Sequence, residues 1–252
     1  MTKKTIKSPK EIEIMKEGGR ILGIVRDELE AMVAPGITAW DIEEMAVQRI
    51  TQLGAKPSFM MVPGYSWATC INVNDGVVHG IPKKSTVLKK GDIMSIDVGV
   101  FLNGFHTDTA VSVYLGDEDE GNHMISSGRE VIALAIKEAK VGNTIGDISK
   151  AIEEGLSTRG LTAVRALTGH GVGRELHEDP RIPCFVGKTK DERVKIENGM
   201  TLAIEIMYTP GRGEIMVDSD GWTIRTKDGR ISALFEETVA ICNGAPVIIT
   251  KA

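Results

Sequence analysis

The sequence predicts an α+β fold with internally duplicated halves, and three observations support this expectation. Several segments carry apolar residues at helical spacing, and the first two begin with capping signals. Apolar strands flank Asn103-Gly104, a pair that strongly favours a two-residue hairpin turn. The second half of the chain also repeats short motifs of the first half in the same order. We therefore expect a mainly antiparallel sheet covered by helices.

The composition is that of an ordinary globular chain and excludes several classes of protein. With 252 residues, 42% hydrophobic and 26% charged, the chain can bury a substantial core as one domain. No apolar run reaches signal-peptide or transmembrane length, so we expect a cytoplasmic protein without membrane contact. A net charge of -5 argues against specific nucleic-acid binding. The three cysteines lack paired spacing, which argues against disulfides and a thiolate zinc site.

The first elements can be placed from their start and stop signals. A capping box at Ser8, with proline at the next position, predicts a long amphipathic helix that ends near residues 34–36. Thr38 predicts the start of a second helix that ends at about Gly54. A region of strands and loops should follow over residues 57–82. Because the first capping box lies so early, we expect no N-terminal extension domain.

Residues 91–113 are predicted to form a hairpin that carries two aspartates on one face. With Asn103-Gly104 as the turn, Asp97 faces Ala110 and Asp108 lies diagonally beside Asp97. Two like charges between apolar strands are unfavourable unless they share a proton or hold a cation. Alternatively, one aspartate could belong to a turn and the other to a solvated edge.

After the hairpin, the acidic run 117–120 is interpreted as a solvated turn. A third helix should cover roughly residues 126–140, and a fourth should start at Thr144. These elements open a second half that matches the first half by motif. We therefore expect a single catalytic domain over 1–252 with pseudo-twofold halves at approximately 8–115 and 116–250. The matching pairs are residues 36–42 with 142–148, 91–97 with 199–205, 105–113 with 234–241, and His79 with His177.

The shared axis of the two halves is predicted to hold a metal centre. Equivalent residues of like halves meet there, so Asp97 and Asp108 would meet Glu205 and Glu236. Four carboxylates between apolar strands repel one another, and two divalent cations would offset their charge. His170 has glycines on both sides and is the best candidate for a nitrogen ligand, although a lone histidine is often structural. This donor set suits Mn, Fe(II), Co or Zn.

Two metals in such a site can share a water and present it as hydroxide to a carbonyl, which indicates a hydrolase. His79 and His177 could hydrogen-bond the substrate or the tetrahedral intermediate, or they could instead cap a helix or stabilise a loop. His106 is considered only as an outer neighbour of Asp108, and His123 as a surface residue.

Six motifs together resemble those of a known family. They are VNDGVVHGIP, GDIMSIDVG, FHTDTA, TGHGVGRELHEDP, GMTLAIE, and DGWT followed by FEET, and they are similar to the motifs of type I methionine aminopeptidases. The resemblance covers about residues 8–249. It implies a pita-bread fold, in which a curved sheet covered by helices surrounds a central two-metal site. It also implies a metalloprotease of protein maturation that removes the initiator methionine from nascent polypeptides.

The resemblance further implies how five residues bind the two ions. Asp97 would chelate one metal, and Asp108 and Glu236 would bridge both. His170 and Glu205 would bind the other metal, and Glu205 would also be the proton shuttle.

The substrate side of the site follows from the same resemblance. His79 would contact the substrate, and His177 would stabilise the intermediate. Tyr65, Cys70 and Trp222 stand at the positions of the methionine pocket, although each could equally be a core residue. Because the pocket accepts one unbranched side chain while the next residue passes near the metals, we expect a preference for a small second residue.

Three residues depart from the usual family pattern beside the proposed ligands. Ile206 replaces a proline, Glu237 replaces a histidine, and Thr107 stands where glycine is common. None of them removes a ligand, so we expect an active site. If the last strand alternates normally, Glu237 points away from the metals.

Two alternative functions remain open on sequence alone. An Xaa-Pro-type peptidase uses a similar ligand set but generally carries a further N-terminal domain. A non-catalytic pita-bread protein that binds a ribosome or RNA would normally lose ligands, and all five are present. For the enzyme itself we expect a monomer, with a transient ribosome contact through Lys83, Lys84, Lys89 and Lys90.

Overall fold

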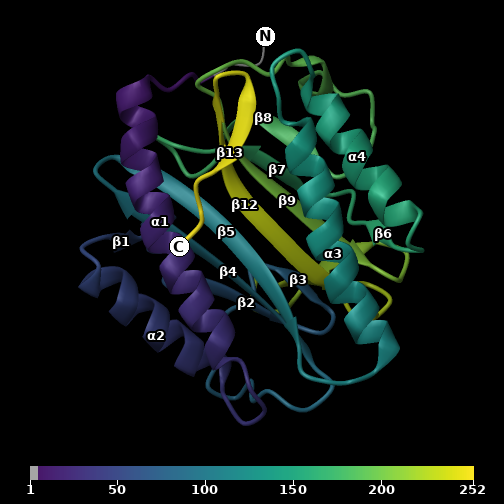
Figure 1. Ribbon diagram of the computed structural model, residues 1–252. Helices are drawn as coiled ribbons and strands as arrows, with labels where there is room; N and C mark the ends of the chain where they lie inside the picture. Colours follow the sequence, from purple (N-terminus) through teal and green to yellow (C-terminus); the bar gives the residue numbers. More distant parts are fainter. Residues whose placement is uncertain (1–4) are drawn as a thin grey trace.

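The computed structural model describes residues 5–252, which form a large antiparallel sheet with helices packed against it, together with a separate three-stranded sheet (Figure 1). Helix α1 packs on β4 and β5, and α3 packs on β9 and β12. In Figure 1 both helices lie across the same face of the sheet, with α2 beside α1 and α4 beside α3. The elements in chain order are α1 (Pro9–Met32), α2 (Ala39–Gln52), β1 (Lys56–Pro57), a 3-10 turn (Phe59–Met61), β2 (Thr69–Val73), β3 (Gly76–Val78), β4 (Ile93–Leu102), β5 (Phe105–Tyr114), α3 (Asp119–Glu138), α4 (Ile145–Ser157), β6 (Thr162–Ala163), β7 (Thr168–Gly171), β8 (Glu178–Pro183), a 3-10 turn (Asp191–Arg193), β9 (Thr201–Thr209), β10 (Ile215–Val217), β11 (Ile224–Thr226), β12 (Ala233–Cys242) and β13 (Ala245–Ile248).

The first two helices start where their capping signals predict. The Ser8 hydroxyl accepts a bond from the Glu11 amide, and the Glu11 carboxylate accepts one from the Ser8 amide at 2.8 Å. Thr38 and Asp41 make the same reciprocal pair at the start of α2. These bonds satisfy amides that would otherwise lack a partner at each helix start. Within residues 5–252, no helix combines the length and apolarity that crossing a membrane requires.

The start of the third helix was predicted wrongly. Helix α3 begins at Asp119 rather than near Ser126, so part of the acidic run 117–120 forms its first turn. Asp119 and Glu120 suit that place because negative charge is favourable at the positive end of the helix dipole. The N-cap residue Glu118 makes no side-chain capping bond in the described structure, so the usual start signal was missing from the sequence.

The hairpin has the predicted register. Leu102 pairs with Phe105, and Asp97 pairs with Ala110. Asn103 and Gly104 both have positive φ, 48° and 93°, as a two-residue type I′ turn requires.

The order of strands brings distant parts of the sequence together. The sheet runs β1-β4-β5-β12-β9-β7-β8, so the hairpin β4–β5 lies directly beside β12 and β9. The sheet face under the helices is apolar, with fully buried residues such as Val98 on β4 and Ile204 on β9. Side chains alternate between the two faces of a strand, so the polar residues between these apolar ones gather on the helix-free face.

Candidate metal centre

Four strands place the predicted acidic ligands in one row across the sheet. Asp97 on β4 is paired with Ala110 on β5, Ala110 with Glu236 on β12, and Glu236 with Glu205 on β9. Directly paired residues of antiparallel strands point to the same face. Asp108 lies two residues before Ala110 and therefore shares this face. The sheet register alone thus turns all four carboxylates towards one side.

His170 reaches the same side from β7. Its strand pairs His170 with Ala203, two residues before Glu205. The His170 Nδ1–H donates to the carbonyl of Gly171 at 2.9 Å, which leaves Nε2 unprotonated. Nε2 lies 4.0 Å from a carboxylate oxygen of Glu205 and 4.0 Å from one of Glu236.

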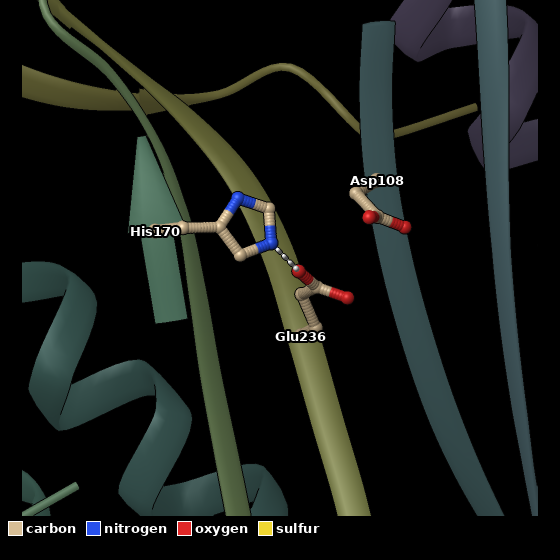
Figure 2. Close-up of side chains that lie close together, drawn as sticks. All are labelled: Asp108, His170 and Glu236. Carbon is tan, nitrogen blue, oxygen red and sulfur yellow. Dashed lines mark ion pairs between the residues drawn. The ribbon is translucent and has the colours of Figure 1, made fainter. Parts of the chain in front are cut away.

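Asp108, His170 and Glu236 form the tightest part of the cluster. Each offers one ligand atom, and these three atoms lie within 4.8 Å of one another. Figure 2 shows the three side chains pointing towards one another from β5, β7 and β12. Such an arrangement of buried oxygen and nitrogen donors can hold a metal ion.

The cluster is electrostatically unfavourable without a cation. Burial raises the pKa of Asp97 to about 7. Burial and the neighbouring carboxylates also raise the pKa values of Asp108, Glu205 and Glu236 well above their usual range. Burial lowers the pKa of His170 to about 3, so its imidazole is neutral. Neutral histidine and carboxylate oxygens are the forms that bind metal.

Unsatisfied atoms show that the donor set fits divalent cations. Among the described residues, Asp97 Oδ1 and Glu236 Oε1 are buried without a hydrogen-bond partner. The free Nε2 lone pair of His170 faces two carboxylates, which is repulsive unless a positive charge lies between them. A cation between these atoms would satisfy all of them.

The candidate ligands and the candidate substrate residues line one cavity of about 150 Å³. Its acidic and imidazole end is next to an apolar end that contains Phe59, Val62 and Leu176. Sequence reasoning missed these three residues, because no local pattern sets them apart from core residues. The predicted residues that line the cavity are Tyr65, Cys70, His79, Asp97, Asp108, His170, His177, Glu205, Trp222 and Glu236.

Aromatic rings form the apolar end of this cavity. The Tyr65 ring meets Trp222 edge-on with centroids 5.1 Å apart, and it meets Trp67 edge-on at 5.2 Å. The Tyr65 hydroxyl donates to the carbonyl of Thr69 at 2.8 Å, so its polar atom is satisfied within the wall. Cys70 pairs with Asp97 across β2 and β4, which puts the thiol beside the acidic end.

Glu43 supports this wall from α2 and was also missed in the sequence. It is 4% exposed and accepts bonds from the amides of Ala68 and Thr69, at 2.7 and 2.9 Å, and from the Thr69 hydroxyl at 2.6 Å. The sequence offered no signal for it, because a carboxylate on an amphipathic helix is ordinarily solvated.

The other histidines have different surroundings. The His177 ring lies 4.4 Å from the His170 ring at 72°, and burial lowers the pKa of both His79 and His177. His106 Nδ1 pairs with the Ser58 hydroxyl at 2.5 Å, and its ring lies 4.7 Å from that of Phe101. His123 is exposed on α3, as a surface residue would be.

The three departures from the family pattern lie around the metal ligands. The Glu237 carboxylate accepts a bond from Arg26 Nη1 at 3.0 Å and one from the Thr250 hydroxyl, on the helix-covered side. It therefore points away from the cluster. Thr107 is buried on β5, and Ile206 is buried on β9 opposite Phe235.

Comparisons with known proteins place the chain in a family. A model of metallopeptidase family M24 matches residues 13–242. The chain is 38% identical to a methionine aminopeptidase of Aquifex aeolicus over 97% of both chains. It is 41% identical to one of Clostridium perfringens, over 97% of this chain and 98% of the other.

Solved structures show the same relationship. The chain is similar to methionine aminopeptidase from Thermotoga maritima, with a TM-score of 0.96 and 41% identity over 99% of this chain and 100% of that one. Prolidase from Pyrococcus furiosus, with a TM-score of 0.78 and 22% identity over 98% of this chain and 65% of that one, shares the fold alone. The predicted α+β class, the pita-bread fold and the resemblance to methionine aminopeptidases are thereby confirmed. The chain therefore belongs to metallopeptidase family M24.

Proposed function

We propose that this protein is a metal-dependent aminopeptidase that removes the N-terminal methionine from nascent polypeptides and prefers a small second residue. The observation that carries the proposal is the single cavity in which the acidic cluster adjoins an apolar pocket. The names and full-length similarity of the relatives support the same activity. The relationship to prolidase is weaker, which disfavours the Xaa-Pro alternative.

We assign the metal ligands as the sequence predicted them. Asp97 would hold one divalent cation, Asp108 and Glu236 would bridge to a second, and His170 and Glu205 would complete the second site. Family membership implies a divalent metal, and the oxygen-rich set suits Mn, Fe(II), Co or Zn. When bound, the ions would supply a water of lowered pKa as the nucleophile.

The residues of this chain would then position the peptide and move protons. The Glu205 carboxylate would accept a proton from the attacking water and pass it to the leaving amine, as a carboxylate beside the scissile bond can do. A neutral His177 donates an N–H to the carbonyl oxygen as negative charge develops there. His79, which lines the same cavity, would contact the substrate.

The apolar end of the cavity would select methionine. Tyr65, Cys70 and Trp222 form its walls, together with Phe59 and Leu176. A thioether packs well against aromatic rings and against sulfur, because it is unbranched and polarizable. The second residue of the peptide passes beside the metal ligands, so bulk at that position would displace the scissile bond.

The test is methionine release after chelation and re-addition of single metals. Restored cleavage of Met-Ala-Ser and slow cleavage of Met-Leu-Ser would support the proposal. Equal rates on the two peptides would refute the specificity, and no release with any metal would refute the activity. Asp97→Ala should abolish both metal binding and cleavage.

We also propose that the chain is one catalytic domain made of two like halves, approximately 8–115 and 116–250. At the start of α4 the Asp147 carboxylate accepts bonds from the Thr144 amide and hydroxyl, as the Asp41 carboxylate does from Thr38 at the start of α2. Each half also consists of a pair of packed helices and neighbouring strands of the large sheet. Separately expressed halves should restore methionine release only when mixed.

We also propose that the enzyme acts as a monomer in the cytoplasm. Because its substrate would be a nascent chain, we propose that it contacts the ribosome transiently. Lys83 and Lys90 form ion pairs with Asp220 and Asp117, at 2.9 and 3.0 Å. Lys84 Nζ lies over the Trp40 ring, 5.2 Å from its centroid, so we expect the exposed Lys89 to contribute most to such a contact. Cosedimentation with ribosomes that persists after all four charges are reversed would contradict it.

A further inference from the structure

The loop between β7 and β8 carries His177 and closes around the carboxylate of the next residue. Glu178 Oε1 accepts bonds from the backbone amides of Arg174 and Glu175, at 2.7 and 3.2 Å. The amide of Gly173 donates to the carbonyl of Glu175 at 3.0 Å. The loop that carries His177 is therefore held by its own amides to the Glu178 carboxylate and by one backbone bond within the loop.

Lys7 holds this carboxylate from the N-terminal segment that precedes α1. Its Nζ donates to Glu178 Oε2 and, at 3.1 Å, to the Thr5 hydroxyl, which also donates to Glu178. The Lys7 side chain is 0% exposed and that of Glu178 is 3% exposed. The Lys7 amide donates to the carbonyl of Gly199 at 2.8 Å, which fixes the segment beside the start of β9.

Two glycines make the slot in which Lys7 lies. A Cβ atom on Gly173 would lie 2.3 Å from Lys7 Cε, and one on Gly199 would lie 2.6 Å from the Lys7 carbonyl oxygen. Both distances are far below van der Waals contact. Gly173, the last glycine of the GHGVG motif, therefore leaves the space that the Lys7 side chain occupies.

The ion pair has a direct consequence for the geometry of the site. A buried carboxylate that loses its cation must either bind a proton or turn towards water. Turning Glu178 towards water would break its bonds to the loop amides and release the neighbouring His177. The far side of the loop stays anchored, because the His106 amide donates to the Gly173 carbonyl at 2.6 Å. The release would therefore affect the His177 end.

We propose that Lys7 is a positioning residue for the reaction and that it acts through Glu178 to hold His177 in the site. The His177 ring lies 4.4 Å from that of His170, close enough for a small displacement to change its place over the cleaved bond. The proposal rests on the proposed function, because the position of His177 matters for rate only if this cavity cuts peptides.

The first test compares steady-state kinetics on Met-Ala-Ser. Lys7→Met should lower kcat by about tenfold to a hundredfold, as expected for a misplaced catalytic group, and leave KM within about twofold. Lys10→Met changes an exposed lysine three residues away and should leave both constants unchanged. An unchanged kcat in Lys7→Met would overturn the proposal.

A double-mutant cycle separates positioning from general damage. In the His177→Ala background, adding Lys7→Met should cost no further kcat, because the group that Lys7 positions is already absent. The full loss persisting in that background would overturn the proposal. Lys7→Met combined with Glu178→Gln removes the unpaired buried charge and should recover part of kcat, which also covers the case in which Lys7→Met alone folds poorly.

A third measurement does not depend on activity. Trypsin should cut the metal-free Lys7→Met protein after Arg174 faster than the parent or Lys10→Met, because the freed loop opens more often. Circular dichroism would establish that the fold is retained. If the parent protein releases no methionine, the proposed function fails. The rate of trypsin cleavage after Arg174 still reports whether Lys7 holds the loop. An unchanged cleavage rate after Arg174 would contradict the inference itself.

Discussion

Replacing Glu43 by alanine tests how the methionine pocket is supported from behind. The Glu43 carboxylate accepts three bonds from Ala68 and Thr69, and its side chain is buried. Alanine would leave the amides of Ala68 and Thr69 without this acceptor, and each unsatisfied amide lowers the free energy of unfolding by about 1–3 kcal/mol. Loss of a buried carboxylate, whose pKa is raised by burial, offsets part of that cost. We therefore expect a net loss of about 3 kcal/mol in the free energy of unfolding.

The assay is thermal and urea unfolding of the metal-free protein, since a bound metal would add its own stabilisation. For a chain of this size, about 3 kcal/mol corresponds to a fall in Tm of roughly 6–12 °C. Glu44→Ala is the matched control, because Glu44 is the next residue on α2 and is exposed. A Tm for Glu43→Ala equal to that of Glu44→Ala would refute the assigned role.

The same substitution should also alter substrate binding. The Tyr65 hydroxyl bonds to the carbonyl of Thr69, and Cys70 follows Thr69 in β2, so the pocket wall depends on the segment that Glu43 holds. We expect KM for Met-Ala-Ser to rise by about fivefold while kcat stays within about twofold, because the metal ligands lie on other strands. A loss confined to kcat would show that Glu43 acts on the chemistry instead.

Three further predictions concern the acidic cluster, the Trp222 loop and the Lys7 slot. Glu236→Gln removes one of four mutually repelling carboxylates, so the free energy of unfolding of the metal-free protein should rise by about 1–3 kcal/mol. The Tm of this variant should no longer rise when Mn is added, and a metal-free Tm below that of the parent would contradict the prediction. Burial raises the pKa of Asp220, but bonds from Lys83 and its neighbours outweigh burial and lower it overall. The stabilisation that the Asp220 carboxylate provides is therefore complete above its unfolded pKa of about 3.9, and it is lost as the pH falls through its lower folded pKa. Asp220→Asn should remove this dependence, so the free energy of unfolding should change less between about pH 5 and 2. Gly173→Ala should displace Lys7 and reproduce the kcat loss of Lys7→Met, and a kinetically normal Gly173→Ala protein would argue against the slot.

Much of the fold was predictable because its signals are local. The capping boxes at Ser8 and Thr38 and the turn at Asn103-Gly104 each act within a few residues, and all were confirmed. The start of α3 was not predictable in the same way. Its first turn is stabilised by charge near a helix end without a side-chain cap among the described residues, and a run of acidic residues is equally typical of a solvated turn.

The candidate site divides along a similar line. Asp97 and Asp108 could be recognised because a charge in an apolar strand is costly, and the repeat connected them with Glu205 and Glu236. Their roles as ligands remain predictions, although all four line one cavity with His170. Phe59, Leu176 and Glu43 could not be found, because only tertiary packing distinguishes a pocket wall or its support from any other buried residue.

The row of paired residues across β4, β5, β12 and β9 sets a requirement on the shape of the whole sheet. The Cα atoms of Asp97 and Glu205 are three strand spacings apart, about 14 Å if the sheet were flat. Side chains as short as these could not share one cavity of about 150 Å³ across that distance. Bending of the sheet towards its helix-free face would bring the two ends of the row together, and the small side chain of Ala110 at the middle of the row adds little bulk there. Curvature is therefore as much a determinant of this centre as its ligands are, and a bulky residue at position 110 should weaken metal binding without removing a single donor.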